Sequence, residues 1–577
     1  MYIKKVFSFV ITLIFLLSPI SFSQNKPEKI DELLNRYLEY RLFNGSALVA
    51  DNGKVIFKRG YGLANMEWNI PNSYDTKFRL GSITKQFTSM LIMQLVEKNK
   101  IKLEDKITDY LPYYRKDIGD KVTIEMLLTH TSGIPSYTNQ PDFFEKTSKQ
   151  YYAPDDFIKE YCSEDLEFEP GTKFNYNNSG YFILGGIIEH VTGKTYEEAL
   201  LENIIKPLGL SETGYDNFES IINKRAAGYE KTGSGYSIAP YLDMALPYAA
   251  GSLYSTVEDL YKWDMALLND KLLPKKYMDD IFTGRVDARN SKYAYGWFID
   301  TVSLAEQEFV VYNHGGGING FNTINYIIPQ KGQVVILFSN TGGAPLNNIT
   351  NAIISILNGQ DYKFPAKPLV DQLNKTIEKA SITEAINEFN KLKSDKELYS
   401  YNERELNLLG YTYLRANKIE EAIAIFKLNI QEYPKSWNVY DSYAEALMVN
   451  GENEGAIENY KKSLELNPNN KQGIEQLKKL GVDYKVAEIV VENSTIIKYV
   501  GEYQLFPEFV ITIRVDGNRI FAQATGQSEI ELFPLSETKF YDKVVNAQME
   551  FFADGKGEIE KMILYQNNRE MPGKKIK

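Results

Sequence analysis

The chain has 577 residues, of which 43% are hydrophobic and 24% are charged, the composition of a globular protein with room for about three to five domains. Asp and Glu outnumber Lys and Arg by 76 to 65, and the resulting net charge of −11 argues against nucleic acid as a partner. A single cysteine, Cys162, excludes a disulfide within the chain, and three histidines that lie far apart argue against a metal cluster.

The amino-terminal residues have the features of an export signal. Two lysines precede an apolar run from residue 6 to 17, and Ser21-Phe22-Ser23 offers a small-x-small cleavage site. A membrane-spanning helix needs about 20 apolar residues, and this run ends too early. We therefore expect residues 1–23 to be removed, and the mature chain to be periplasmic or secreted, without a membrane anchor.

Residues 24–360 alternate helix and strand signals. Helical spacing predicts helices over Lys29–Leu42, Ile83–Glu97 and Tyr181–Val191, and one that Ser255 and Glu258 cap and that ends near Leu268. Strands are expected over 46–50 and 54–60, around an Asp51-Asn52-Gly53 turn, and over 309–312, 323–328 and 334–338. Because helices lie between an early hairpin and late strands, we expect an α+β domain whose first and last strands share one antiparallel sheet.

Residues 361–481 contain a linker and an internal helical repeat. A shift of 34 residues superimposes Gly410 on Ala444, Ala422 on Ala456, Phe426 on Tyr460 and Pro434 on Pro468. This period and this pattern of small, large and proline residues are typical of tetratricopeptide repeats, and a looser copy lies near Ala385. Stacked helical pairs form a concave groove, so the segment is either a binding site for a protein or peptide partner or a simple spacer.

Residues 482–577 return to alternating strand patterns. Strands are predicted over 509–515, 519–524 and 529–533, with Asp-Gly turns between strands. We expect a small all-β, barrel-like domain, and we find no catalytic constellation in it.

The first candidate for chemistry is Ser82-Ile83-Thr84-Lys85. Positions i and i+3 of a helix are neighbours, so the lysine amine can reach the serine oxygen. A neutral amine can take the serine proton, and the free N–H of Ser82 at a helix start can stabilise an oxyanion. The same spacing recurs elsewhere in the chain, but only Ser82 opens an amphipathic helix. The alternative is a serine that caps the helix beside a solvated lysine.

Two further elements carry suitable side chains. Tyr176-Asn177-Asn178, expected on a loop, offers a phenol that can relay protons and an amide that can hold a carbonyl, although a core aromatic and a turn asparagine would look the same. His314-Gly315-Gly316-Gly317 ends an apolar strand, where glycines let a substrate approach and the Gly317 N–H can be a second oxyanion donor. A dinucleotide fingerprint through Gly315, Gly317 and Gly320 is rejected because a strand pattern follows it.

Together these elements resemble the serine β-lactamase-like superfamily of class C β-lactamases, D-Ala-D-Ala carboxypeptidases, D-aminopeptidases and esterases. The resemblance covers about residues 30–355. Further motifs stand in the family's order, namely Phe78-Arg79-Leu80-Gly81, Leu127–Ile134, Glu169–Phe174, Ala250–Thr256 and Tyr295-Gly296-Trp297. It implies an antiparallel sheet beside an all-helical subdomain, with the serine in the cleft between them.

The resemblance also assigns roles. Ser82 is similar to the family's acyl-accepting nucleophile, Lys85 to its proton acceptor and Tyr176 to the tyrosine that shares acid–base work. Asn178 and the run from His314 through Gly315 and Gly316 to Gly317 are implied to bind substrate. No metal or organic cofactor is implied, because a covalent serine mechanism needs neither. His130 and His190 are expected to be structural.

One departure narrows the expected substrate. Antibiotic-hydrolysing members have Lys-Thr-Gly where this chain has His314-Gly315-Gly316, which lacks the fixed positive charge and the hydroxyl that would hold a carboxylate. We therefore expect an exported serine hydrolase that acts on an ester, amide or small peptide, including cell-wall-derived or D-amino-acid-containing ones. The alternative is an inactive penicillin-binding-like scaffold that binds peptides or cell-wall fragments through its repeats.

Overall fold

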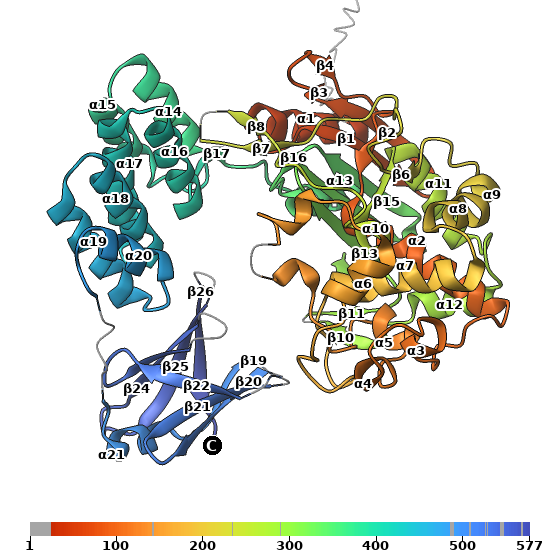
Figure 1. Cartoon of the computed structure of the whole chain (residues 1–577). Helices are drawn as coiled ribbons and strands as arrows, with labels where there is room; N and C mark the ends of the chain where they lie inside the picture. The colour runs from red at the N-terminus through yellow and green to blue at the C-terminus, as the bar shows by residue number, and fades with distance from the viewer. Residues whose placement is uncertain are drawn as a thin grey trace, which may run out of the picture.

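The computed structural model describes residues 25–140, 143–233, 235–288, 290–484, 490–506, 509–525, 527, 529–542, 547–566 and 569–577. Figure 1 shows an α+β domain, a stack of helices and a small barrel, which follow one another along the chain. The expected signal peptide, residues 1–23, lies outside the described residues. Within the described part, no helix has the length and apolar character needed to cross a membrane.

The α+β domain is built on one eight-stranded antiparallel sheet. In spatial order its strands are β10 (Val286–Ala288), β11 (Ser291–Tyr293), β12 (Phe298–Leu304), β13 (Gln307–Ile318), β14 (Phe321–Ile328), β15 (Gln333–Ser339), β1 (Gly45–Asp51) and β2 (Lys54–Tyr61). The first strand β1 pairs with the last long strand β15, in a register that sets Gly45 opposite Ser339. The expected early hairpin, late strands and shared sheet are therefore confirmed.

Helices cover both faces of this sheet (Figure 1). The helices of this domain are α1 (Lys26–Glu39), α2 (Thr84–Glu97), α3 (Ile107–Tyr110), α4 (Lys116–Gly119), α5 (Ile124–Leu128), α6 (Pro154–Tyr161), α7 (Asn178–Thr192), α8 (Tyr196–Leu200), α9 (Lys206–Leu208), α10 (Tyr248–Gly251), α11 (Val257–Leu268), α12 (Lys275–Phe282) and α13 (Leu346–Leu357). Successive side chains of β1 alternate between two cores: Val49 packs with α1 and α13, and Leu48 with α2 and α11.

Short strands complete this domain. They are β5 (Phe78–Arg79), β9 (Leu253–Ser255) and β6 (Gly214–Tyr215) in one sheet, β16 (Thr341–Gly342), β7 (Tyr229–Lys231) and β8 (Tyr236–Ile238) in a second, and the pair β3 (Leu63–Asn65) with β4 (Ile70–Pro71). A further pair, β17 (Lys367–Pro368) with β18 (Tyr399–Ser400), lies beyond this domain, among the helices that follow it.

Three helix starts differ from the sequence-based expectation. Helix α1 begins at Lys26 rather than Lys29, because the Asn25 side chain caps it by accepting from the N–H of Glu28. The cap of α11 is Thr256, whose hydroxyl accepts from the backbone N–H of Asp259, whereas Ser255 ends β9 and bonds to Thr213 instead. Helix α7 begins at Asn178 rather than Tyr181, because the Asn177 side chain accepts from the N–H of Gly180. Asn178 is thus fixed in a first helical turn and not in a loop.

The middle of the chain is helical. It contains α14 (Leu369–Lys379), α15 (Ile382–Leu392), α16 (Glu403–Arg415), α17 (Ile419–Glu432), α18 (Trp437–Val449), α19 (Asn453–Leu466) and α20 (Lys471–Lys479). This helical stack contacts the α+β domain where the Arg41 guanidinium binds the Asp371 carboxylate, with Nε 3.1 Å from Oδ2. Gly233, in the turn between β7 and β8, also lies close to α16, because an added Cβ would be 2.5 Å from Leu409 Cα.

The carboxy-terminal part is a closed eight-stranded barrel, which confirms the expected all-β domain. After α21 (Asn493–Ile496) come β19 (Gly501–Phe506), β20 (Phe509–Asp516), β21 (Arg519–Ala524), β22 (Ile530–Pro534), β23 (Lys539–Asp542), β24 (Gln548–Ala553), β25 (Ile559–Gln566) and β26 (Arg569–Lys575). Pairing of β19 with β26 closes the barrel, and Tyr503, Phe551 and Met562 lie in its core. The Asn469 amide of the helical stack donates to the Asp542 carbonyl, 2.9 Å away.

Candidate active site

Ser82 lies in a single 3₁₀ turn, Gly81–Ile83, directly before α2. Leu80, the residue before this turn, is fixed by two hydrogen bonds. Its N–H donates to Leu253 O at 2.7 Å, and its carbonyl accepts from the Thr323 hydroxyl at 2.7 Å. Gly81 has φ +56°, and a Cβ on it would lie 2.9 Å from the Gly317 nitrogen. Glycine at position 81 therefore brings the serine turn against the Gly317 strand.

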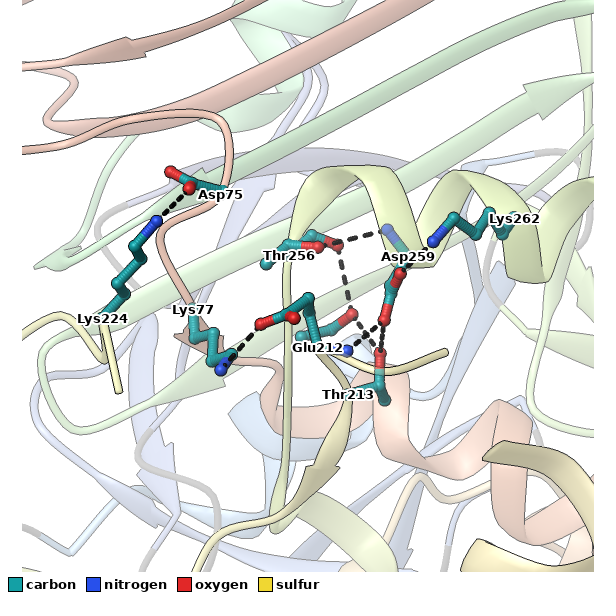
Figure 2. Close-up of polar contacts among 9 residues, drawn as sticks. Asp75, Lys77, Glu212, Thr213, Lys224, Thr256, Asp259 and Lys262 are labelled. Carbon is teal, nitrogen blue, oxygen red and sulfur yellow. Dashed lines mark hydrogen bonds and ion pairs between the residues drawn. The ribbon is translucent and has the colours of Figure 1, made fainter. Parts of the chain in front are cut away.

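A polar cluster supports the strand that leads to Ser82 (Figure 2). Lys77, which precedes β5, binds Glu212 with 2.8 Å between Nζ and Oε2. The buried Asp259 carboxylate accepts from the N–H of Glu212 at 2.7 Å and from the Thr213 hydroxyl at 3.2 Å. The start of α11 and the approach to β5 are thereby tied together through one short segment.

Lys85 is fully buried and has three oxygen neighbours. Its Nζ lies 3.1 Å from Ser82 Oγ, 2.9 Å from Asn178 Oδ1 and 2.9 Å from the Ala250 carbonyl. Burial lowers the pKa of Lys85 to about 7. The amide and carbonyl oxygens only accept hydrogen bonds, so a neutral amine directs its two hydrogens to them and its lone pair to the Ser82 hydroxyl.

Tyr176 is half-buried beside this pair, with its hydroxyl oxygen buried and the Lys85 Nζ 4.9 Å from its ring centroid. Burial raises the pKa of the Tyr176 phenol well above its usual value, and the nearby Ser82 hydroxyl offsets part of that rise. Its hydroxyl forms no well-aligned hydrogen bond with a described group. It is therefore a protonated phenol with a free donor beside the serine.

Asn178 positions the lysine. Its backbone N–H donates to Ser136 Oγ at 3.0 Å, and its side-chain nitrogen donates to Thr138 Oγ1 at 3.2 Å. Its side-chain oxygen is thereby turned to Lys85. The side chain also lines the cavity, where the sequence predicted a substrate contact.

His314 is buried and stands outside the described cavity lining, in a directed chain of hydrogen bonds. His130 Nδ1 accepts from the N–H of Asn177 at 3.3 Å, so its Nε2 carries the hydrogen and donates to Tyr293 Oη at 3.2 Å. Tyr293 then donates to His314 Nε2 at 3.2 Å, and His314 Nδ1 donates to Gly315 O at 2.6 Å.

Both imidazoles of this chain of hydrogen bonds are neutral at physiological pH. Burial, with the Lys85 charge nearby, lowers the pKa of His314 to about 3 and that of His130 well below its usual value. The chain of hydrogen bonds therefore joins the segment that carries Tyr176 and Asn178 to the glycine strand. Sequence reasoning missed Tyr293; its only signal was its place just before the Tyr295-Gly296-Trp297 motif.

The glycine run continues β13 beyond its partner β12. Pairing with β12 ends at Asn313, and among the described strands none covers that edge from His314 to Ile318. Gly316 faces the serine turn, where a Cβ would overlap the Leu80 carbonyl, and Gly317 lines the cavity. The open edge can pair with an extended substrate, and Gly317 lies against the serine turn as an oxyanion donor requires.

The serine turn and the glycine strand border a cavity of about 430 Å³, within the usual range for small-molecule sites. Ser82, Asn178 and Gly317 line it, together with apolar side chains such as Phe143 and Leu246. Among the described residues, no three His, Cys, Asp or Glu side chains are grouped as a metal site requires.

The remaining singled-out residues lie elsewhere. His190 is on α7 and contacts Asp155 Oδ2 at 3.1 Å, and Cys162 is buried and unpaired.

Two family descriptions match the chain. The family described as Beta-lactamase matches residues 30–356, and one described as a domain of unknown function matches residues 488–576. PbpX of Bacillus subtilis (strain 168), whose name describes a penicillin-binding protein, is 32% identical over 330 residues, which are 57% of this chain and 78% of PbpX.

Two solved structures share the fold. The octameric penicillin-binding protein homologue from Pyrococcus abyssi superposes with a TM-score of 0.51 at 21% identity, over 95% of this chain and 99% of that chain. EstCE1, a hydrolase with promiscuous acyltransferase activity, has a TM-score of 0.51 at 18% identity, over 58% and 98%. Since the matched family spans more than half of the sequence, the chain belongs to the β-lactamase family, through residues 30–356, as a serine hydrolase.

Proposed function

We propose that the protein hydrolyses esters, amides or small peptides that need no carboxylate, through an acyl-enzyme on Ser82. The observation that carries this proposal is the environment of Lys85, where two pure acceptors leave the amine lone pair to Ser82 Oγ, 3.1 Å away. That geometry gives the serine a base without any further group.

In the proposed mechanism Ser82 Oγ attacks the substrate carbonyl carbon while its proton passes to Lys85 Nζ. The negative oxygen of the tetrahedral intermediate is held by the N–H groups of Ser82 and Gly317. When the bond to the leaving group breaks, that group takes a proton from the Tyr176 hydroxyl, and Tyr176 regains a proton from Lys85, which is then neutral again. Water attacks the acyl-enzyme and gives a proton to Lys85, which passes it to Ser82 Oγ as the bond to the acyl group breaks and the acid is released.

Lys85 suits the role of base better than Tyr176. Its pKa of about 7 leaves much of the amine neutral at physiological pH, whereas burial raises the pKa of Tyr176 and disfavours its phenolate. Tyr176 instead fits a donor to the leaving group, because its hydroxyl hydrogen is uncommitted.

We also propose that the helical stack is formed by tetratricopeptide repeats and serves a protein or peptide partner. In support, α16 and α18 start 34 residues apart, as do α17 and α19. Gly410 packs on Phe426, and the matching residues Ala444 and Tyr460 share a buried cluster. Export to the periplasm or medium is part of the proposal and rests on the amino-terminal sequence alone.

The direct test is Ser82→Ala. A fluorophosphonate probe should label the wild-type protein and not this variant, and hydrolysis of p-nitrophenyl butyrate should fall by at least about 10³-fold. Circular dichroism controls for folding. A folded variant that hydrolyses the ester at the wild-type rate would show that Ser82 is not the nucleophile.

A further inference from the structure

The cavity around Ser82 has one charged side chain among its described lining residues, that of Glu230 on β7. The other polar groups there are amides and hydroxyls, such as Asn319 and Thr138. The neighbouring Lys231 does not neutralise it, because successive strand residues point to opposite faces and Lys231 lies beside Asp371 and Glu405 of the helical stack.

Glu230 is held in a fixed position. The N–H of Gly320, at the β13–β14 turn, donates to Glu230 Oε1 at 3.0 Å. Gly342 makes room for the carboxylate, since a Cβ there would overlap it. The backbone from Gly317 to Gly320 spans at most about 11 Å. With the 3.0 Å hydrogen bond added, the carboxylate lies at most about 14 Å from Gly317, within reach of a short peptide whose carbonyl is bound there.

We propose that Glu230 selects substrates with a free amino group, namely amides or esters of single amino acids and dipeptides. An ammonium group on the acyl part would form a charge-assisted hydrogen bond with Oε2, which Gly320 leaves free. A carboxylate at the same place would be repelled. This selection rests on the proposed acyl-enzyme at Ser82 and adds a substrate class to it.

The test compares matched substrates. Alanine and dialanine p-nitroanilides, in D and L forms, are assayed with and without an N-acetyl group. Glu230→Gln keeps an oxygen for Gly320 and loses only the charge. We expect kcat/KM for at least one free amine to fall about tenfold or more, while the acetylated compound changes less than about twofold. Glu104→Gln, an exposed carboxylate outside the cavity lining, is the matched control and should change neither.

The pH profile gives an independent readout. An α-amino group titrates near pH 7.7–8.0, so the wild-type ratio of free-amine to acetylated rates should fall above pH 8 and should stay flat in Glu230→Gln. Equal use of both substrates by the wild type, or an equal loss on both in the variant, would overturn the selection by Glu230. Fluorophosphonate labelling and p-nitrophenyl butyrate hydrolysis are measured in parallel, so a failure of Ser82 chemistry is recognised separately.

Discussion

At the scale of single residues, we expect Lys85, as the proposed base, to set the pH dependence of hydrolysis. Its pKa is lowered to about 7, and a base must be neutral, so kcat/KM for p-nitrophenyl butyrate should rise with pH to a plateau above about pH 8. The substitution Lys85→Arg should lower kcat/KM by about 10²–10⁴-fold, because the guanidinium group stays protonated and cannot act as a base. Substantial activity in Lys85→Arg, with a deep loss of acylation in Tyr176→Phe, would assign the base to Tyr176.

The hydrogen-bond chain through Tyr293 makes a spectroscopic prediction. Ring-nitrogen NMR should find His130 with its hydrogen on Nε2 and His314 with its hydrogen on Nδ1, both neutral from pH 6 to 8. Tyr293→Phe leaves two buried nitrogens without a partner, so stability should fall by about 1–3 kcal/mol. An imidazolium signal from either ring at pH 6 would contradict the chain.

The sequence predicted the site through spacing and order, which are visible in one dimension. Ser82 and Lys85 lie one helical turn apart, and the structure brings Asn178 to the same amine. Tyr293 and Glu230 carry no local pattern, since each becomes distinct only through partners far along the chain. The buried side chain of His314 was likewise not readable from its motif.

At the scale of elements, the tight contact between β13 and the serine turn can be tested by substitution. A Cβ at Gly316 would overlap the Leu80 carbonyl, which is backbone and cannot rotate away, so Gly316→Ala should displace the strand and lower kcat by at least about 10²-fold. Gly315→Ala should cost much less, because its Cβ would meet Thr323 O at 3.6 Å. Similar losses in the two variants, compared at equal folded fraction, would count against this geometry.

The types of the elements were predictable, because the period of the apolar residues and the turn residues indicate them. For example, the strand expected after Gly320 is β14. The residues at which elements begin and end were less predictable. Competing side-chain hydrogen bonds decide them, as when Ser255 bonds Thr213 and leaves the helix cap to Thr256.

At the scale of the whole molecule, the residues named in the mechanism all lie before residue 360. A protein of residues 24–360 should therefore keep p-nitrophenyl butyrate hydrolysis close to that of the full chain. Loss of the partly buried Arg41–Asp371 pair, worth about 1 kcal/mol, should lower Tm by about 1–2 °C in a domain of this size. A truncated protein that is folded by circular dichroism yet resists fluorophosphonate labelling would mean that the helical stack completes the site.

The pairing of β1 with β15 also has a consequence for synthesis on the ribosome. The hairpin of β1 and β2 is synthesised near the start of the domain, whereas β15, which pairs with the other edge of β1, is synthesised only near its end. At about 5–20 residues per second, β1 waits on the order of tens of seconds with an unpaired edge. A nascent chain that stalls before β15 would therefore expose an unpaired strand edge, which can pair with other chains, before the domain is complete. We expect chaperone binding to matter most during this interval.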